Sequence, residues 1–213
     1  MHNWKMGGEA GYGIMNTGGP IFAKTLMRAG FFVFIYSEYP SLIRGGHNTM
    51  QVTASESPCD AVYLALDQLV ALNAHTIVAH QAEVKNGGVI LYDSNLIKFS
   101  DDGRIDNSRI PTLTGSHTVA AGRAQTSRRP DIAYVPIPLE DIATQNGGDK
   151  IMRNVAAVGG SIAIFEQKVP GATGLLALAD QILADIFKKK GEAVISANQK
   201  VLEAGYNEIK KLK

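Results

Sequence analysis

The sequence predicts an α/β protein with three α/β/α layers and a parallel or mixed central sheet, spanning residues 1–213 as a single domain. Short apolar runs typical of buried strands alternate with longer segments in which apolar residues recur at helical spacing. Two glycine-rich stretches, 7–13 and 39–48, each follow such a run, and the first leads directly into a helical pattern. Strands that alternate with helices favour a sheet covered on both faces.

The first half of the chain is expected to supply most of the sheet. A helix is expected over 14–29, with Pro20 causing a kink or a delayed start. Met50 and Val52 alternate with side chains that are expected to be exposed. Asp67 is positioned to begin a helix, and a further helical piece is expected around 76–84. The expected strands are 3–6, 31–36, 48–54, 61–66 and 89–92.

The second half is expected to hold a hairpin, a long polar excursion, one more strand and three closing helices. Asp101-Asp102-Gly103 signals the tight turn of the hairpin, and 93–130 is rich in Ser, Thr, Asp, Gly and Arg. Loops of that length are usually functional or mobile. The strand is 132–137, and the apolar stripes of the helices are 151–165, 175–187 and 202–212. The pair Gly159-Gly160 allows a close neighbour on the first of these helices, and Gly191 ends the second.

Composition limits the function classes. A formal charge of +1 predicts no general attraction to nucleic acid or to a membrane surface. The run 188–190 of three lysines fits the end of a helix, where cations oppose the dipole. The single cysteine, Cys59, excludes an internal disulfide and a self-contained iron–sulfur site, which needs four thiolates. With no signal peptide and no apolar stretch long enough to span a bilayer, we expect a cytoplasmic protein.

The glycine loops predict a site for an anion. A strand, a glycine loop and a helix N-terminus together expose backbone N–H groups that can hold a phosphate. The first loop differs in spacing from the dinucleotide fingerprint G-x-G-x-x-G, although Glu38 follows the second strand where that fold places its ribose-binding acid. Tyr12 and Met15 would crowd a pyrophosphate there.

The second loop carries Arg44 and His47 around two glycines. Arginine beside free N–H groups suits an anion, but a rigid corner in which Arg44 pairs with Glu38 is an equal alternative. His75 and His80 are five residues apart and so do not share a helical face as a metal pair would. We therefore expect no metal site, and no nucleophile elbow indicates hydrolase chemistry.

At these loops the sequence resembles the gamma domain of the 2-oxoacid:ferredoxin oxidoreductases, the pyruvate and 2-oxoglutarate ferredoxin oxidoreductase family. The resemblance is carried by Gly7-Gly8-Glu9-Ala10-Gly11-Tyr12-Gly13 and, most specifically, by Tyr36-Ser37-Glu38-Tyr39-Pro40-Ser41-Leu42-Ile43-Arg44-Gly45-Gly46-His47-Asn48. Segments 61–67, 87–93, 135–138, 154–159 and 204–206 agree with it. The polar stretch 100–130 lies outside the resemblance and is longer than the family usually has.

The resemblance implies an oxidoreductase subunit that is inactive alone. Such enzymes oxidatively decarboxylate a 2-oxoacid, transfer the acyl group to coenzyme A and reduce ferredoxin in anaerobic metabolism. Thiamine diphosphate, magnesium and iron–sulfur clusters would then reside on partner alpha, beta and ferredoxin-like delta chains. This chain would supply docking and a candidate coenzyme A site, mapped onto Gly8, Gly11, Gly13, Arg44, Gly45, Gly46 and His47, with no catalytic residue of its own.

Other interpretations remain open from the sequence. The main alternative is a free-standing nucleotide-binding protein that uses the first glycine loop and Glu38. A further one makes both loops pure interface elements. Pyruvate, 2-oxoglutarate, branched-chain and aryl 2-oxoacids are all open as substrates, with the second loop favouring 2-oxoglutarate. The chain could equally be a separate subunit or a fragment of a longer alpha chain.

Overall fold

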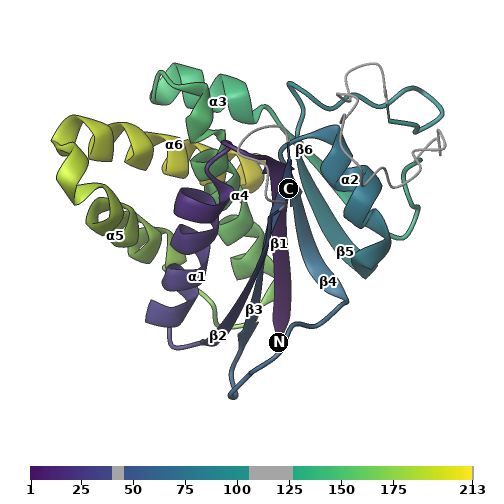
Figure 1. Ribbon diagram of the computed structural model, residues 1–213, viewed down its shortest axis with the longest axis horizontal. Helices are drawn as coiled ribbons and strands as arrows, with labels where there is room; N and C mark the ends of the chain where they lie inside the picture. Colours follow the sequence, from purple (N-terminus) through teal and green to yellow (C-terminus); the bar gives the residue numbers. More distant parts are fainter. Residues whose placement is uncertain (40–45, 106–126, 213) are drawn as a thin grey trace.

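The computed structural model describes residues 1–39, 46–105 and 127–212. They form a six-stranded sheet of order β2-β3-β1-β4-β5-β6 (Figure 1). Strands β1, β4, β5 and β6 run parallel, whereas β3 is antiparallel to both β1 and β2. The expected α/β fold with a mixed sheet is therefore confirmed. The strands are β1 His2–Glu9, β2 Phe32–Glu38, β3 His47–Ser55, β4 Leu66–Ala71, β5 Val84–Asp93 and β6 Ala133–Ile137.

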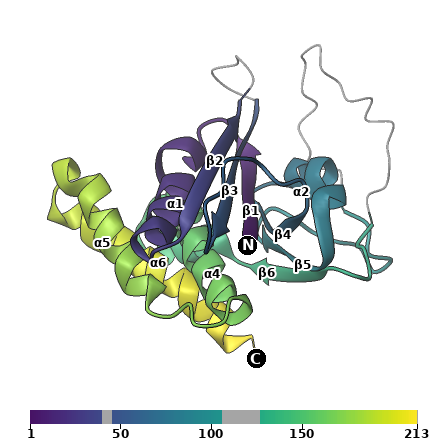
Figure 2. The same cartoon turned by 90° about the horizontal axis from the view of Figure 1, so that it is seen from below.

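The helices are divided unequally between the two faces of the sheet. Helices α1, α4, α5 and α6 gather on one side, called here the helix face, whereas α2 lies on the opposite side (Figures 1 and 2). The helices are α1 Gly19–Arg28, α2 Ala74–His80, α3 Leu139–Asn146, α4 Arg153–Lys168, α5 Leu175–Phe187 and α6 Glu192–Lys211. Short turns of other helix types are η1 Ile14–Gly18, η2 Gln81–Glu83, η4 Lys150–Met152 and η5 Lys188–Lys190.

The helix face holds the main core. Trp4 is fully buried there, stacks on Phe22 with ring centroids 4.4 Å apart, and donates its indole N–H to Ser161 Oγ at 3.0 Å. Helices α4 and α6 pack closely because a side chain at Gly159 or Gly205 would collide with the backbone of the other helix. The close approach predicted at Gly159 is confirmed.

The opposite face is divided in two. Beneath α2 a second, smaller apolar cluster includes Leu69, Ile77 and Ile90. Over β1 and β3 the side chains are polar and yet buried, among them Asn3, Lys5, Gln51 and Thr53. The alternate face of β3, which the sequence suggested would be exposed, is therefore buried.

The chain between β3 and β4 covers this polar area, which explains the difference. The Gln51 amide donates to the carbonyl of Tyr63 at 2.7 Å, and the Asn3 amide donates to the carbonyl of Ala65 at 3.0 Å. The strand expected over 61–66 is thus wrong: 61–65 is irregular, and β4 begins at Leu66. Its apolar composition is typical of a strand, but its backbone groups bond to side chains of β1 and β3.

Several other boundaries differ from expectation. Asp67 lies within β4 rather than at a helix start, and Asn73 caps α2 by accepting the Thr76 N–H at 3.0 Å. Strand β5 begins at Val84, earlier than the expected strand 89–92. The short helix α3 was not foreseen. The delayed helix start at Pro20 is confirmed, because α1 follows a π-helical turn, and the predicted hairpin is present as a bridge between Phe99 and Ile105.

Candidate ligand site at the glycine loops

The first glycine loop lies where the chain changes sides of the sheet. From β1 the chain passes to α1 on the helix face, whereas from the neighbouring parallel strand β4 it passes to α2 on the other (Figure 1). In open α/β sheets, ligands bind beyond the carboxyl ends of the strands at such a switch point. The sequence thus folds its first glycine loop into the position where this architecture ordinarily holds a ligand.

The structure brings the two glycine loops together. The Ala10 N–H donates to the carbonyl of Gly46 at 2.8 Å, and Glu9 pairs with His47 in the β1–β3 ladder. Residues 4 through 9 and 47 through 52 are therefore adjacent although the loops are far apart in sequence. Of the seven candidate residues, Gly8, Gly11, Gly13, Gly46 and His47 are described, and Arg44 and Gly45 lie outside the described residues.

The glycines of the first loop serve different purposes. Gly8 belongs to β1, where a Cβ would meet Leu72 and Tyr12 at 3.1 Å, so its smallness is a packing requirement. Gly13 has a φ of 75° and faces the Asn154 amide too closely for a side chain. Of these three glycines only Gly11, with a φ of 99° and no atom within 4 Å of the place a Cβ would occupy, opens onto free space. Gly11 is thus the loop glycine best placed to receive a ligand.

A hydrogen-bonded chain of side chains starts beside Gly7. His47 Nε2 lies 2.9 Å from His80 Nε2, and His80 Nδ1 lies 2.7 Å from Glu83 Oε1. The second oxygen of Glu83 accepts from the buried Lys5 ammonium at 2.5 Å. His75 adds its ring edge-on to His47, with centroids 4.6 Å apart. These residues come from β1, β3, α2 and η2.

The environment favours a neutral imidazole at His47 and an ionised carboxylate at Glu83. Burial, with smaller contributions from the neighbouring His75 and His80, lowers the pKa of His47 to about 3. Burial would raise the pKa of Glu83, but hydrogen bonds from His80 and Lys5 outweigh it and bring that pKa below its ordinary value. His47 therefore presents a lone pair, and Nδ1 is buried with no partner among the described residues.

A second polar group supports the first loop from the helix face. The Asn154 amide donates to the carbonyl of Tyr12 at 2.7 Å, and the Arg153 guanidinium lies 4.6 Å from the centre of the Tyr12 ring. Arg153 Nη1 is 3.9 Å from Asp93 and 3.6 Å from Glu140. Burial raises the pKa of Asp93 to about 6, against the backbone N–H of Asn95 and the Arg153 charge. This group holds the loop in place.

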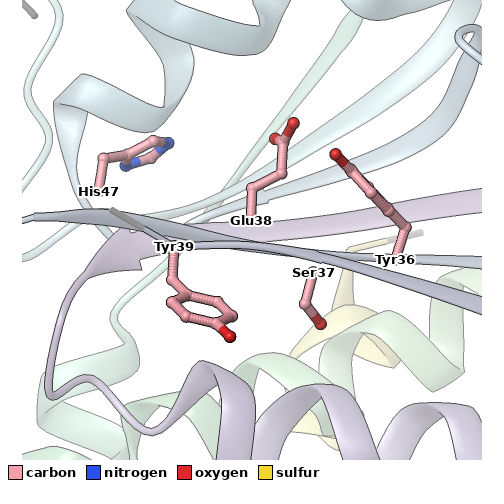
Figure 3. A pocket seen from close by; sticks show the side chains of 5 residues that line it. All are labelled: Tyr36, Ser37, Glu38, Tyr39 and His47. Atoms are coloured by element: carbon pink, nitrogen blue, oxygen red, sulfur yellow. The ribbon is translucent and has the colours of Figure 1, made fainter. Parts of the chain in front are cut away.

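Beyond His47, an open hollow of about 620 Å³ is lined by β2 and the start of β3. Tyr36, Glu38 and His47 project to one side of the hairpin, and Ser37 and Tyr39 project to the other (Figure 3). Glu38 accepts a hydrogen bond from the Thr49 hydroxyl at 3.1 Å. The hollow borders the His47 end of the histidine chain and is bounded by tyrosines.

Sequence reasoning missed how the histidines meet. His75 and His80 were judged by their spacing along one helix, whereas His47 from another strand lies against both. A histidine next to the second glycine loop was the one available signal. In the described part of the chain, no group of three or more His, Cys, Asp or Glu side chains is arranged to hold a metal ion. No described helix is long and apolar enough to cross a membrane.

Comparison with known proteins identifies the family. The family model described as "Pyruvate ferredoxin/flavodoxin oxidoreductase" matches residues 3–208. A curated relative, the alpha subunit of a 2-oxoacid:ferredoxin oxidoreductase from a Sulfolobus species, is 23% identical over 96% of this chain and 34% of its own length. The chain thus spans about a third of the length of that relative.

Solved structures share the fold. A 2-oxoglutarate:ferredoxin oxidoreductase from Magnetococcus marinus, with 2-oxoglutarate, coenzyme A and succinyl-CoA bound, superposes with a TM-score of 0.74 at 22% identity, over 100% of this chain and 31% of that one. The gamma subunit of a keto/oxoacid ferredoxin oxidoreductase from Geobacter sulfurreducens superposes with a TM-score of 0.67 at 20% identity, over 99% of both chains. The fold is therefore found both as part of a longer chain and as a separate subunit.

Proposed function

The chain belongs to the pyruvate ferredoxin/flavodoxin oxidoreductase family, and on that premise we propose that it is the gamma-type component of a 2-oxoacid:ferredoxin oxidoreductase. The complex would oxidatively decarboxylate a 2-oxoacid to its acyl-CoA and reduce ferredoxin. The match over residues 3–208 is the observation that carries this proposal, because it covers both glycine loops and the core that supports them.

Within that complex we assign this chain a docking role and a part of the coenzyme A site. The support is local: Gly11 opens onto free space at the switch point, and the first loop is bonded to the second through Ala10 and Gly46. Exposed backbone N–H groups at a glycine loop suit the phosphates of coenzyme A. Coenzyme A, when bound, supplies the thiol that takes up the acyl group. Gly8 and Gly13 would support the loop, and Arg44 and Gly45 stay assigned by resemblance alone.

The remaining cofactors are assigned to partner chains. Cys59 is the only cysteine in the sequence, and its thiol lies 3.5 Å from the carbonyl of Phe32, so the residues present do not fit an iron–sulfur cluster. We propose that alpha, beta and ferredoxin-like delta chains bring the clusters, the thiamine diphosphate and its magnesium ion, in the cytoplasm. Pyruvate and 2-oxoglutarate are the first substrates to test.

A free-standing nucleotide binder is the less favoured function. Its proposed acid, Glu38, is engaged by Thr49 on the neighbouring strand, and the family match extends over nearly the whole chain.

The test is the coenzyme A dependence of the intact complex. The protein is purified in mild salt with its partner chains, and reduction of a viologen dye is followed with a panel of 2-oxoacids at varied coenzyme A. Gly11→Leu should raise the coenzyme A concentration that gives half-maximal rate at least tenfold, because the side chain occupies the open space. Gly30→Leu is the matched control: Gly30 has a φ of 93° and equally free surroundings, but lies in the turn between α1 and β2.

Two results would overturn the proposal. Absence of activity with every 2-oxoacid, from a preparation that contains all the partner chains, would remove the oxidoreductase function. Equal coenzyme A dependence in the two variants would remove this chain from the coenzyme A site while leaving its docking role.

A further inference from the structure

Among the described residues, the side chains of Glu83, His80 and His47 form a continuous hydrogen-bonded line, and we propose that it is a proton relay. Its unpartnered end, Nδ1 of His47, would accept the proton of a thiol held beside the first glycine loop. His47 is then the residue that meets the ligand, and His80 and Glu83 are positioning residues. The choice of the coenzyme A thiol as the donor rests on the proposed function.

When both rings are neutral, the hydrogen-bond pattern fixes the positions of the protons. The ionised Glu83 can only accept, so His80 Nδ1 must carry the proton in the 2.7 Å contact. A neutral His80 then has a bare Nε2, so the proton in the 2.9 Å contact with His47 must be on His47 Nε2. A neutral His47 protonated at Nε2 has a bare Nδ1. For two neutral rings, the two contacts thus determine both tautomers.

The bare nitrogen is placed to meet a donor. Nδ1 of His47 is buried and has no partner among the described residues, a condition that folded proteins rarely leave uncompensated. The His47 ring lies against the backbone of Gly7, where a Cβ would be 3.2 Å from its Cε1. The hollow lined by Tyr36 and Glu38 borders the same residue (Figure 3). The unpartnered nitrogen thus belongs to a ring that borders both β1 and the hollow, and this is where we place the donor.

The relay conserves protons at each step. The S–H bond of the thiol breaks as Nδ1 of His47 takes the proton, and the Nε2 proton of His47 passes to Nε2 of His80. The products are a thiolate and a His80 imidazolium, which remains hydrogen-bonded to the Glu83 carboxylate. No oxidant or reductant takes part. The positive charge thus moves away from the thiolate and comes to lie next to a carboxylate.

The surrounding charges are consistent with this direction. Lys5 faces Glu83 from β1 and holds the carboxylate ionised. On α2, burial lowers the pKa of His75, with a further contribution from the nearby His80, so His75 stays neutral and adds no opposing cation. Glu38, from β2, lines the hollow and would favour a cation over an anion there. A thiolate forming next to His47 would therefore depend on the relay.

The first experiment reads the tautomers directly. The chain is labelled with ¹⁵N-histidine, and long-range ¹H–¹⁵N spectra at neutral pH assign the protonated nitrogen of each ring. We expect the proton on Nε2 of His47 and on Nδ1 of His80. A proton on Nδ1 of His47 would overturn the relay, whatever the chain binds.

The second experiment identifies the donor with coenzyme A and desulfo-coenzyme A, which lacks only the sulfur. Coenzyme A should shift the His47 nitrogen signals and bind at least threefold more tightly than desulfo-coenzyme A. Glu83→Gln should remove that difference, whereas Glu56→Gln, at an exposed position in the segment after β3, should preserve it. Equal responses to the two ligands would overturn the thiol as donor.

These results separate the two proposals. Failure of coenzyme A to bind the intact complex would overturn the proposed coenzyme A site and the thiol assignment together. Binding of both ligands with an unaltered His47 would overturn the relay alone and leave the coenzyme A site in place.

Discussion

The two faces of the sheet around β1 and β3 differ in what they bury. On the helix face, Trp4, Met6 and Val52 pack into a continuous apolar core. On the opposite face, the alternating residues Asn3, Lys5 and Thr53 are buried to nearly the same extent but are held by hydrogen bonds and an ion pair. The same strands therefore provide stability on one side and a buried polar line that leads to His47 on the other.

This difference explains where chemistry can arise. An unpaired ionised group is strongly disfavoured in an apolar core, whereas the polar face supplies the paired Lys5 and Glu83 at the end of the histidine chain. Each side can be tested separately because neighbouring residues of one strand point to opposite faces.

The largest effect is expected on the helix face. Trp4→Ala should lower the free energy of unfolding by about 3–5 kcal/mol, since it removes a fully buried ring that stacks on Phe22. Urea denaturation of the chain measures it. Ser161→Ala is the control, because it keeps the ring and removes only the hydroxyl that accepts the indole N–H and donates to the Ala157 carbonyl, which should cost about 1 kcal/mol. Equal losses in the two variants would contradict the packing role of the ring.

A smaller loss is expected from the buried ion pair on the polar face. Lys5→Met should cost about 2 kcal/mol, because it leaves the Glu83 carboxylate with His80 as its remaining partner in a half-buried position. Lys200→Met, at an exposed position on α6, should change stability by less than about 0.5 kcal/mol. A Lys5→Met variant as stable as Lys200→Met would show that the pair contributes nothing.

Each face of the sheet buries one histidine, and both histidines make the stability of the fold depend on pH. Burial lowers the pKa of His47 to about 3 and that of His2, which contacts Phe165 on the helix face, to about 4. The unfolded chain then binds more protons, so stability should fall as the pH drops below about 6.5, by up to about 1.4 kcal/mol per pH unit for each histidine. Asp93, with its pKa raised to about 6, acts in the opposite direction between about pH 4 and 6.

Histidine variants assign this slope. His47→Gln and His2→Gln should each reduce the loss of stability between pH 6.5 and 5, as measured by urea denaturation at a series of pH values. An unchanged slope in His47→Gln would mean that His47 is protonated in the folded protein, which would also contradict its role as the relay acceptor.

The smallest expected effect is the difference in stability loss between substitutions at two neighbouring residues of β3. Val52→Thr places a hydroxyl in the apolar core and should cost about 2 kcal/mol. Thr53→Val removes the donor to Asn3 Oδ1, a 2.9 Å bond, and should cost about 1 kcal/mol. Thermal unfolding of both variants measures the difference. The reverse order of effects would mean that the polar face is the more sensitive one.

Much of the architecture followed from local pattern. The alternation of Met50 and Val52 identified the core side of β3, and Pro20 correctly predicted that α1 would start late after the first loop. Gly159 correctly predicted a close helix neighbour. These features depend on residues near one another in sequence, so they can be read without knowing the rest of the fold.

The errors arose where a distant segment determined the structure. The segment 61–65 has strand-like composition, but its carbonyls bond to Asn3 and Gln51. Asp67 resembles a helix cap, yet it lies in β4, where its carboxylate accepts the backbone N–H of Asn3 at 2.8 Å. Periodicity alone cannot show which partner a backbone or carboxylate group will find.

The sequence by itself determined the alternation of strands and helices, the two glycine loops and the family, because each depends on short runs of residue type. The tertiary structure alone decided that the loops meet through Ala10 and Gly46 and that His47 meets His80, which in turn bonds Glu83. The Ala10–Gly46 and His47–His80 contacts join residues more than thirty positions apart, and they form only when the order of the strands brings β1, β3 and α2 to one end of the sheet. The tautomers of His47 and His80 and the charge of Glu83 depend on these long-range contacts, which a local sequence pattern cannot predict.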